Sequence, residues 1–259
     1  MEEGIVKVEE PDPLRSVLKI LKDCKHITFL TGAGISKESG IPTFRDKDGY
    51  WSKYNPMKLA SPQGFLENPA LVWKWYRHRL KIISSARPNQ THEAIKEMEK
   101  YFNVTVITQN IDNLHIEAGS TYVIELHGNI FRSRCTQCAA KFDTSLLKEK
   151  IPRCPKCGGI IRPDVVWFGE ILNEDLLKRC YEVLAITDAI FVIGTSNQVY
   201  PAAGFPLLVK QHGGKVIEIN LNNTPFSPIA DVFLQGRATL WMKAILEKLK
   251  EWKNSMSLS

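Results

Sequence analysis

The sequence has no uninterrupted apolar run long enough to cross a membrane. Its first ten residues, MEEGIVKVEE, also lack the basic and apolar segments of a secretory signal peptide. We therefore expect a cytoplasmic protein with no membrane partner. Because thiols stay reduced in that compartment, the six cysteines are not expected to form disulfides by default.

Blocks of like charge are missing as well. Lysine and arginine are scattered along the chain, and the formal net charge is only +6. A solvated surface accounts for this distribution, although attraction to acidic partners, including proteins associated with nucleic acids, remains an alternative. With 259 residues, the chain is long enough for one large α/β domain and a smaller insert.

A third glycine is missing where a dehydrogenase fingerprint would need it. The apolar run at 26–31 leads into Gly32 and Gly34, which is typical of a buried parallel strand followed by a phosphate-binding turn. The motif G-x-G-x-x-G would place its last glycine at Lys37. The glycine pair therefore indicates either a nucleotide-binding turn or an ordinary tight turn, and a polar loop is expected to follow it.

Four further apolar runs predict the rest of a sheet. They lie at 104–107, 122–126, 189–193 and 215–219, and helical patterns separate several of them. This alternation predicts a Rossmann-like, doubly wound, mostly parallel α/β sheet.

The helical patterns have recognisable starts and inward faces. Asp12 and Asn173 are expected to cap helices, and a helical insert is expected before residue 85, with an aromatic-rich helix near 70–84. The last helix, from about residue 238, is expected to pack four leucine and isoleucine side chains inward: Leu240, Ile245, Leu246 and Leu249.

Polar or glycine-rich residues follow all five predicted strands. Ligands bind beyond the carboxyl ends of the strands in an open α/β sheet, so these endings predict one shared crevice. Polar residues also end many strands that bind nothing, and this alternative applies to each strand taken singly. The five endings are 31–34, 108–110, 127–128, 194–196 and Asn220.

Two C-x-x-C pairs lie between the third and fourth predicted strands. Their fifteen-residue separation matches the spacing of a four-thiolate zinc site, which has no open position for catalysis. We therefore expect one structural Zn²⁺ that stabilises a small ribbon, rather than a redox pair. The four ligands are Cys135, Cys138, Cys154 and Cys157. Cys24 and Cys180 fall on apolar faces of predicted helices and are expected to be inert.

An extended apolar segment at 162–170 follows the ribbon. It predicts either a strand that returns to the sheet or an edge that pairs with a substrate backbone.

Several of these motifs together resemble the sirtuins, the Sir2-type protein deacylases. The resemblance covers roughly residues 14–250, and its motifs occur in the family's order. Besides the four cysteines they are GAGIS at 32–36, TFR at 43–45, TQNID at 108–112, LHG at 126–128, VVWFGE at 165–170, GTS at 194–196 and EIN at 218–220.

The resemblance implies that the crevice binds NAD. By residue-by-residue transfer, the cofactor-binding set is Gly32, Ala33, Gly34, Ser36, Phe44, Arg45, Gln109, Asn110, Ile111, Asp112, Gly194, Thr195, Ser196, Asn220, Leu221, Asn222 and Ala238. Asp46 departs from the glycine that is common in the family, which affects the expected conformation of the cofactor loop.

The resemblance also implies a reaction in which NAD is consumed and no hydride moves. The acyl oxygen of an acylated lysine attacks the nicotinamide ribose, and the products are nicotinamide, free lysine and O-acyl-ADP-ribose. Asn110 and Asp112 would act with a base, His127, whose neutral imidazole suits proton removal near neutral pH. Taken alone, a histidine at a strand end is more often an ordinary polar residue, and the other five histidines keep that interpretation.

The choice of acyl group is expected to depend on Tyr76 and Arg79. They are three residues apart on a predicted helix, so a phenol and a guanidinium share one face and can bind a carboxylate. This spacing, with a small residue at Ala60, resembles the desuccinylase and demalonylase branch of the family. The alternative is a solvated arginine beside a packed tyrosine. Val166 and Phe168 would flank the substrate peptide.

The expected domain plan has four parts. Residues 1–11 form an acidic disordered tail; 12–45, 86–130 and 165–259 form the NAD-binding domain; 46–85 form the helical insert and cofactor loop; and 131–164 form the zinc domain.

Two other functions remain open at this point. A mono-ADP-ribosyltransferase would use the same chemistry with another nucleophile, and a zinc-ribbon nucleic-acid binder would need a basic or aromatic platform that the ribbon lacks. The expected partners are acylated lysines of proteins, possible targets being metabolic enzymes or a chromatin protein with an indirect effect on transcription, and no direct contact with nucleic acid is expected. The sequence does not indicate an oligomeric state.

Overall fold

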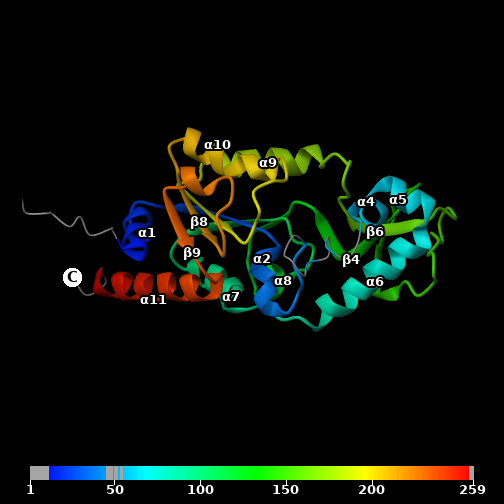
Figure 1. Cartoon of the computed structure of the whole chain (residues 1–259), viewed down its shortest axis with the longest axis horizontal. Helices are drawn as coiled ribbons and strands as arrows, with labels where there is room; N and C mark the ends of the chain where they lie inside the picture. Colours follow the sequence, from blue (N-terminus) through cyan, green and yellow to red (C-terminus); the bar gives the residue numbers. More distant parts are fainter. Residues whose placement is uncertain (1–11, 45–48, 50–51, 53–54, 257–259) are drawn as a thin grey trace, which may run out of the picture.

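The computed structural model describes residues 12–44, 49, 52 and 55–256, and its largest feature is a six-stranded parallel sheet (Figure 1). The strand order is β3-β2-β1-β7-β8-β9, which is the doubly wound arrangement that the sequence predicts. The strands are β1 (His26–Thr31), β2 (Asn103–Thr108), β3 (Val123–Glu125), β7 (Ala189–Ile193), β8 (Lys215–Asn220) and β9 (Val232–Gln235).

The edge strand β9 was not expected from the sequence. It has only four residues, and just two of them, Val232 and Leu234, are buried. So short a run carries little periodic signal, and its identity as a strand depends on pairing with β8.

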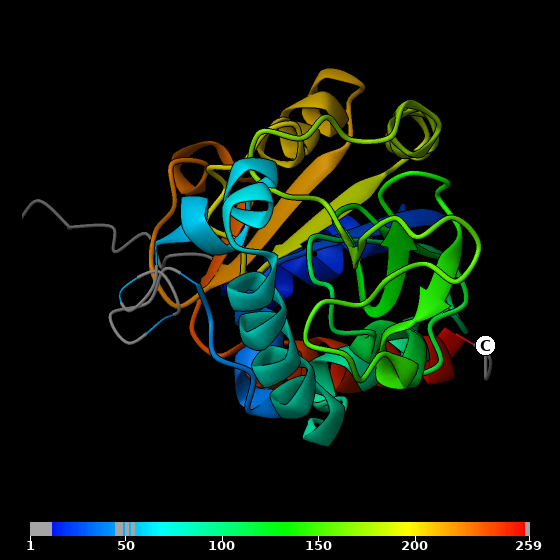
Figure 2. The same ribbon diagram turned by 90° about the vertical axis from the view of Figure 1, so that its right-hand side faces the viewer.

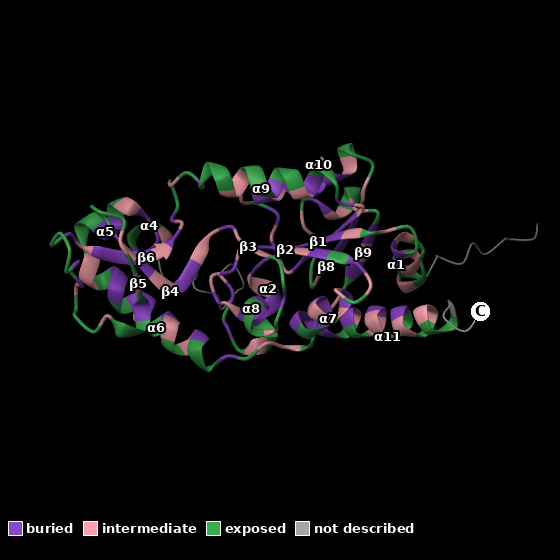
Figure 3. Cartoon of the chain, turned by 180° about the vertical axis from the view of Figure 1, so that it is seen from behind, coloured by how far each residue is buried: buried purple, intermediate pink, exposed green. Residues whose placement is uncertain are grey.

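Helices cover both faces of this sheet (Figures 1 and 3). The buried side chains of β1 alternate between the faces, so Ile27 and Phe29 join one core cluster and Leu30 joins the other. The first face packs against α1 (Pro13–Leu21), α7 (Gln90–Met98) and α11 (Ala238–Met256), and the second against α9 (Glu174–Ala185) and α10 (Phe205–Gln211).

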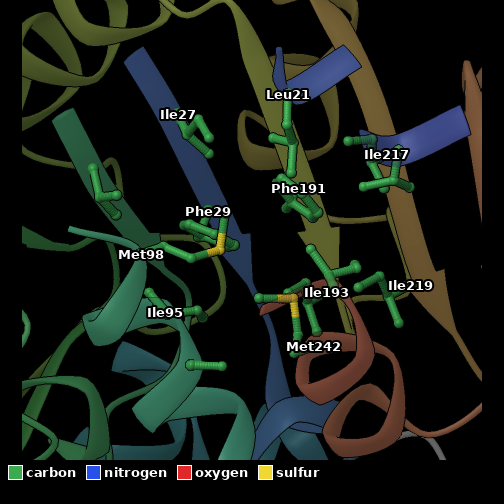
Figure 4. Packing of buried hydrophobic residues seen from close by; sticks show 14 of the residues in the cluster. Leu21, Ile27, Phe29, Ile95, Met98, Phe191, Ile193, Ile217, Ile219 and Met242 are labelled. Carbon is green, nitrogen blue, oxygen red and sulfur yellow. The ribbon is translucent and has the colours of Figure 1, made fainter. Parts of the chain in front are cut away.

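Figure 4 shows the first of these clusters, in which Phe29 and Phe191 stack with ring centroids 4.9 Å apart. The expected inward position of Leu240 is wrong, because this side chain is 59% exposed. The face of α11 that packs on the sheet carries Met242 and Ile245 instead. The predicted caps are confirmed: Asp12 accepts a hydrogen bond from Leu14 N at 3.0 Å, and Asn173 accepts one from Leu176 N at 2.9 Å.

A smaller lobe lies beyond the carboxyl ends of the strands (Figure 2). Its antiparallel sheet has the order β5-β4-β6, formed by β4 (Gly128–Cys135), β5 (Lys141–Asp143) and β6 (Ile161–Val165). The helices α4 (Pro56–Leu59), α5 (Pro62–Glu67) and α6 (Pro69–Ser85) complete the lobe. Trp73 of α6 is fully buried against this sheet, where its indole nitrogen donates to Ile161 O at 2.9 Å.

The beginning of the extended segment at 162–170 therefore belongs to a strand, β6, which pairs with β4. The expected boundary between residues 130 and 131 falls inside β4, which runs continuously from the main domain into the small sheet. Among the described residues, no helix combines the length and apolarity needed to cross a membrane.

Candidate active site

Two glycine turns meet between β1 and β7, where the order of the strands in the sheet reverses. Gly34 N donates to Gly194 O at 2.8 Å, and a Cβ atom on Gly34 would lie only 2.7 Å from Gly194 Cα. Gly194 also has a φ of +61°, which favours glycine. The glycines of the two motifs are thus required by a backbone-to-backbone contact, and this contact sets one wall of the crevice.

A cavity of about 810 Å³ opens at this point and extends to the smaller lobe. Every predicted cofactor-binding or substrate-binding residue that the structure describes lies in its wall, as does His127. Arg45 and Asp46 fall outside the described residues. Residues far apart in the chain therefore surround one space, in agreement with the expectation of a single crevice.

A buried polar cluster lies in one part of this cavity. Ser36 Oγ donates to Asp112 Oδ2 at 2.6 Å, while Asn110 Nδ2 donates to Ser36 Oγ at 3.1 Å and to Gly32 O at 3.0 Å. Burial raises the pKa of the Asp112 carboxyl, and the hydrogen bond from Ser36 opposes that shift. These contacts hold the ends of β1 and β2 in a fixed relation.

His127 follows β3 and is oriented by one hydrogen bond. Its Nδ1 lies 3.1 Å from the backbone carbonyl oxygen of Gln109. A carbonyl oxygen can only accept, so Nδ1 carries the proton and Nε2 keeps a lone pair. Burial lowers the pKa of His127, which keeps the imidazole neutral at pH 7. The residue can therefore take up a proton at Nε2.

Near β8, the polar residues at the carboxyl ends of three strands contact one another. Gln109 Nε2 donates to Thr195 Oγ1 at 3.0 Å, and Asn220 Nδ2 donates to Thr195 O at 2.8 Å.

Glu38 is a cavity residue that sequence reasoning missed. Arg237 Nε donates to Glu38 Oε2 at 2.6 Å, and Thr239 Oγ1 donates to Glu38 Oε1 at 2.9 Å. Burial opposes ionisation, but these hydrogen bonds and the nearby guanidinium hold the pKa of Glu38 below its usual value. No sequence signal could have paired residues 199 positions apart.

The opposite end of the cavity is an aromatic enclosure around Arg79. The guanidinium carbon lies 4.8 Å from the ring centroid of Phe44, 4.9 Å from that of Trp75 and 5.9 Å from that of Tyr76. Arg79 is only 4% exposed, and Tyr76 Oη accepts a hydrogen bond from Trp167 Nε1 at 2.9 Å. Trp75 of α6 and Trp167 of the segment after β6 also line the cavity.

The segment after β6 runs between the two lobes. Val166 N donates to His127 O, and Phe168 N donates to Ala60 O, both at 2.9 Å. Ala60 lies in the cavity wall beside the aromatic enclosure. The extended backbone therefore joins the candidate base to the helical insert.

The four predicted zinc ligands converge. Their Sγ atoms all lie within 4.8 Å of one another, with 3.4 Å between Cys135 and Cys157 and 3.6 Å between Cys138 and Cys154. Tetrahedral zinc with Zn–S bonds of about 2.3 Å requires S···S separations of about 3.8 Å, so the sulfurs fit a structural zinc ion. Backbone N–H groups, those of Cys138 first and then Gln137, lower the pKa of the Cys135 thiol.

Cys24 and Cys180 stand apart from this site. Burial raises the pKa of Cys24 to about 12 and that of Cys180 to about 11, as expected for unreactive thiols.

The geometry defines a nucleotide-binding α/β protein with a zinc-stabilised second lobe. Residues 32–201 match the family described as "SIR2: Sir2 family". The protein therefore belongs to the Sir2 family.

Two relatives illustrate the likeness in sequence. The NAD-dependent protein deacylase of Pyrococcus abyssi is 50% identical over 230 residues, which cover 86% of this chain and 92% of the relative. The NAD-dependent protein deacylase 1 of Caldanaerobacter subterraneus subsp. tengcongensis is 53% identical over 222 residues, covering 85% and 92%.

Solved structures of Sir2 proteins are similar to this chain in fold. A Sir2 homolog in complex with NAD is 45% identical, with a TM-score of 0.87 and coverage of 93% of this chain and 95% of that one. A complex described as Sir2, p53 peptide and NAD⁺ is 33% identical, with a TM-score of 0.84 and coverage of 91% and 98%.

Proposed function

We propose that this protein is an NAD-dependent protein-lysine deacylase that removes acetyl groups and, through Tyr76 and Arg79, acidic acyl groups such as succinyl and malonyl. The observation that carries the proposal is the single cavity that joins the two glycine turns, His127 and the Tyr76–Arg79 enclosure. A cofactor at the turns and an acyl group in the enclosure would thus share one space that includes His127.

NAD fits the polar part of the cavity. The glycine turn that leads into α2 (Ala33–Ser36) and the turn at Gly194 both lie in the cavity wall, where the diphosphate would approach the backbone. When bound, NAD supplies an electrophilic ribose carbon and nicotinamide as leaving group. Asn110 and Asp112 would hold the nicotinamide side, while Thr195, Ser196 and Asn220 would hold the adenosine side.

His127 would act as the base. The hydrogen bond from Nδ1 to Gln109 O fixes the ring and leaves Nε2 as the proton acceptor. Its role would be to remove a proton from a ribose hydroxyl, so that the acyl group passes to that oxygen and lysine is released. With one water consumed to release the lysine amine, the reaction would give nicotinamide, deacylated lysine and O-acyl-ADP-ribose.

The enclosure supports selection of acidic acyl groups. A guanidinium buried among aromatic rings provides a fixed positive charge, and the Tyr76 hydroxyl can donate because Trp167 already donates to its oxygen. A carboxylate at the end of an acyl chain would interact with both groups. An acetyl group has no terminal carboxylate and would make neither contact. Acetyl-lysine would therefore be a substrate, but a less favoured one than succinyl- or malonyl-lysine.

The substrate proteins would be cytoplasmic. We include acylated metabolic enzymes and a chromatin-associated protein among the candidates, the latter with an indirect effect on transcription.

Mass spectrometry of matched peptides tests the proposal. Acetyl-, succinyl- and malonyl-lysine peptides of one sequence are incubated with the protein, with and without labelled NAD. We expect NAD-dependent loss of the acyl group and labelled O-acyl-ADP-ribose, most rapidly with the acidic acyl groups. Label attached to the peptide or protein would instead indicate ADP-ribosyl transfer.

A further inference from the structure

A chain of buried hydrogen bonds connects α8 (Leu114–Glu117) to the cavity. His115 Nε2 lies 2.9 Å from Thr31 Oγ1, and Thr31 Oγ1 donates to Thr108 Oγ1 at 2.9 Å. The backbone N–H of Asn110 donates to the same Thr108 oxygen at 3.1 Å. The four residues are buried, so no bulk water competes for these groups.

The direction of the protons follows from these contacts. Thr31 donates its only hydroxyl proton to Thr108, so His115 Nε2 must be the donor toward Thr31. His115 is therefore the neutral tautomer with its proton on Nε2. Any other state of the ring would leave Thr31 without this donor or would put a charge into the core.

A second histidine packs against the first. His92 of α7 lies edge-on to His115, with ring centroids 4.8 Å apart. Its Nδ1 accepts from Asn89 N at 3.3 Å, and the Asn89 side chain donates to Ile35 O at 2.8 Å and to Ser39 Oγ at 2.9 Å. The pair thus lies between the segment that carries the glycine turn and the strand end that carries Asn110.

This arrangement costs stability. Within the described part of the chain, His92 Nε2 and His115 Nδ1 have no hydrogen-bond partner although both are buried. Burial lowers the pKa of both histidines, that of His92 to about 4, so both rings stay neutral. Two apolar side chains of similar volume would avoid the cost of two unsatisfied polar atoms. A feature that lowers stability next to a binding site is more readily explained by what it positions.

We propose that His115 is a positioning residue that acts through Thr31 and Thr108 to fix the Asn110 backbone, with His92 supporting its ring. The proposal rests on the proposed function, because it takes Asn110 to be on the nicotinamide side of the cavity. Loss of the chain would let the β2 end shift relative to the glycine turn, which would weaken NAD binding without affecting the acyl-peptide site.

Two threonines of β1 provide a matched pair of variants. Thr31→Val removes the hydroxyl of the chain, whereas Thr28→Val removes another buried hydroxyl, which bonds Thr187 Oγ1 at 2.7 Å near the opposite end of the strand. Both substitutions keep the shape of the side chain. We expect Thr31→Val to raise the Kd for NAD, measured by calorimetry, and the KM for NAD about tenfold, with an unchanged KM for the acylated peptide. Thr28→Val should leave all three constants unchanged.

His115 itself is tested by rescue. Gln has a side-chain N–H that can replace Nε2 as a donor to Thr31, whereas Leu has none. We expect His115→Leu to reproduce the effect of Thr31→Val and His115→Gln to restore NAD binding to within about threefold of the unsubstituted protein. Melting temperatures of all variants separate folding defects from binding defects.

Two results would overturn the inference. One is an equal change in NAD affinity for Thr31→Val and Thr28→Val; the other is equal NAD affinity for His115→Leu and His115→Gln. Because NAD affinity is measured without peptide, both results are distinct from failure of the proposed function, which would show as absent turnover by the unsubstituted protein.

Discussion

Trp167 Nε1 donates a hydrogen bond to the hydroxyl oxygen of Tyr76 at 2.9 Å, although the two residues are 91 positions apart in the chain. Both residues line the cavity that includes Arg79, Tyr76 from the helical insert and Trp167 from the segment after β6. The hydrogen bond thus connects the Tyr76–Arg79 motif of α6 to a residue from the second half of the chain, and both contribute to the wall of the cavity.

Arg79→Met should selectively reduce turnover of succinyl-lysine. It removes the buried positive charge while keeping an unbranched side chain, so we expect kcat/KM for the succinyl peptide to fall at least tenfold and that for the acetyl peptide to change little. Arg77→Met on the same helix is the control, because Arg77 contacts the backbone of Glu149 and Lys150 and does not line the cavity. An unchanged succinyl-to-acetyl ratio in Arg79→Met would rule out the acyl-reading role.

His127→Ala should abolish most turnover while leaving NAD binding largely intact. A positioned general base contributes a factor of roughly 10²–10⁴ to rate, so kcat should fall by that order. His212→Ala, at the exposed end of α10, is the control and should retain full activity. Retained activity in His127→Ala, measured by single-turnover kinetics, would refute the base assignment.

The pH profile of kcat should show an acid limb below pH 6.5. Burial lowers the pKa of His127 from its usual value of 6.5, so the imidazole stays neutral at pH 7 and becomes protonated only as the pH falls through the lowered pKa. Activity should therefore persist at pH 6.5 and decline at lower pH. Stopped-time assays on the acetyl peptide measure the pH profile of kcat. An acid limb centred above pH 6.5 would be inconsistent with the buried environment of His127.

The free energy of unfolding should fall as the pH drops from 6.5 to 4. His92 has a pKa lowered by burial to about 4, against 6.5 for an unperturbed histidine, so the unfolded chain binds more protons in this window. The free energy of unfolding is therefore unaffected by this histidine above pH 6.5. Between pH 6.5 and pH 4 it falls by about 3 kcal/mol, at about 1.4 kcal/mol per pKa unit. Urea unfolding of His92→Gln should show a shallower slope, and an identical slope would contradict the assignment.

Removing zinc should destabilise the smaller lobe. A ribbon of this size has little core of its own, so a strong chelator should lower the melting temperature of the whole protein. Cys138→Ser should lose bound zinc by atomic absorption, whereas Cys24→Ser should retain it. A melting curve insensitive to chelator, together with absence of zinc from the purified protein, would count against the four-thiolate site.

Much of the fold could be predicted because its signals are local. The apolar run and glycines of residues 26–34 predicted β1 and its turn, and the spacing of the cysteine pairs predicted a zinc site whose sulfurs converge. β9 was missed because four residues carry too little periodicity, and the outward position of Leu240 depends on the rotation of α11 against the sheet. Neither could be derived without the packing of neighbouring elements.

The features of the candidate site also fall into those that local sequence predicts and those that only tertiary packing sets. The sequence by itself determined which backbone turns and strand ends are polar or glycine-rich, because each depends on residues adjacent in the chain. Only the tertiary structure decided that Glu38 meets Arg237, that Trp167 meets Tyr76 and that two buried histidines pack together. These contacts arise when separate helices and strands close around one cavity, and their partners are set by the packing of whole elements rather than by any local pattern.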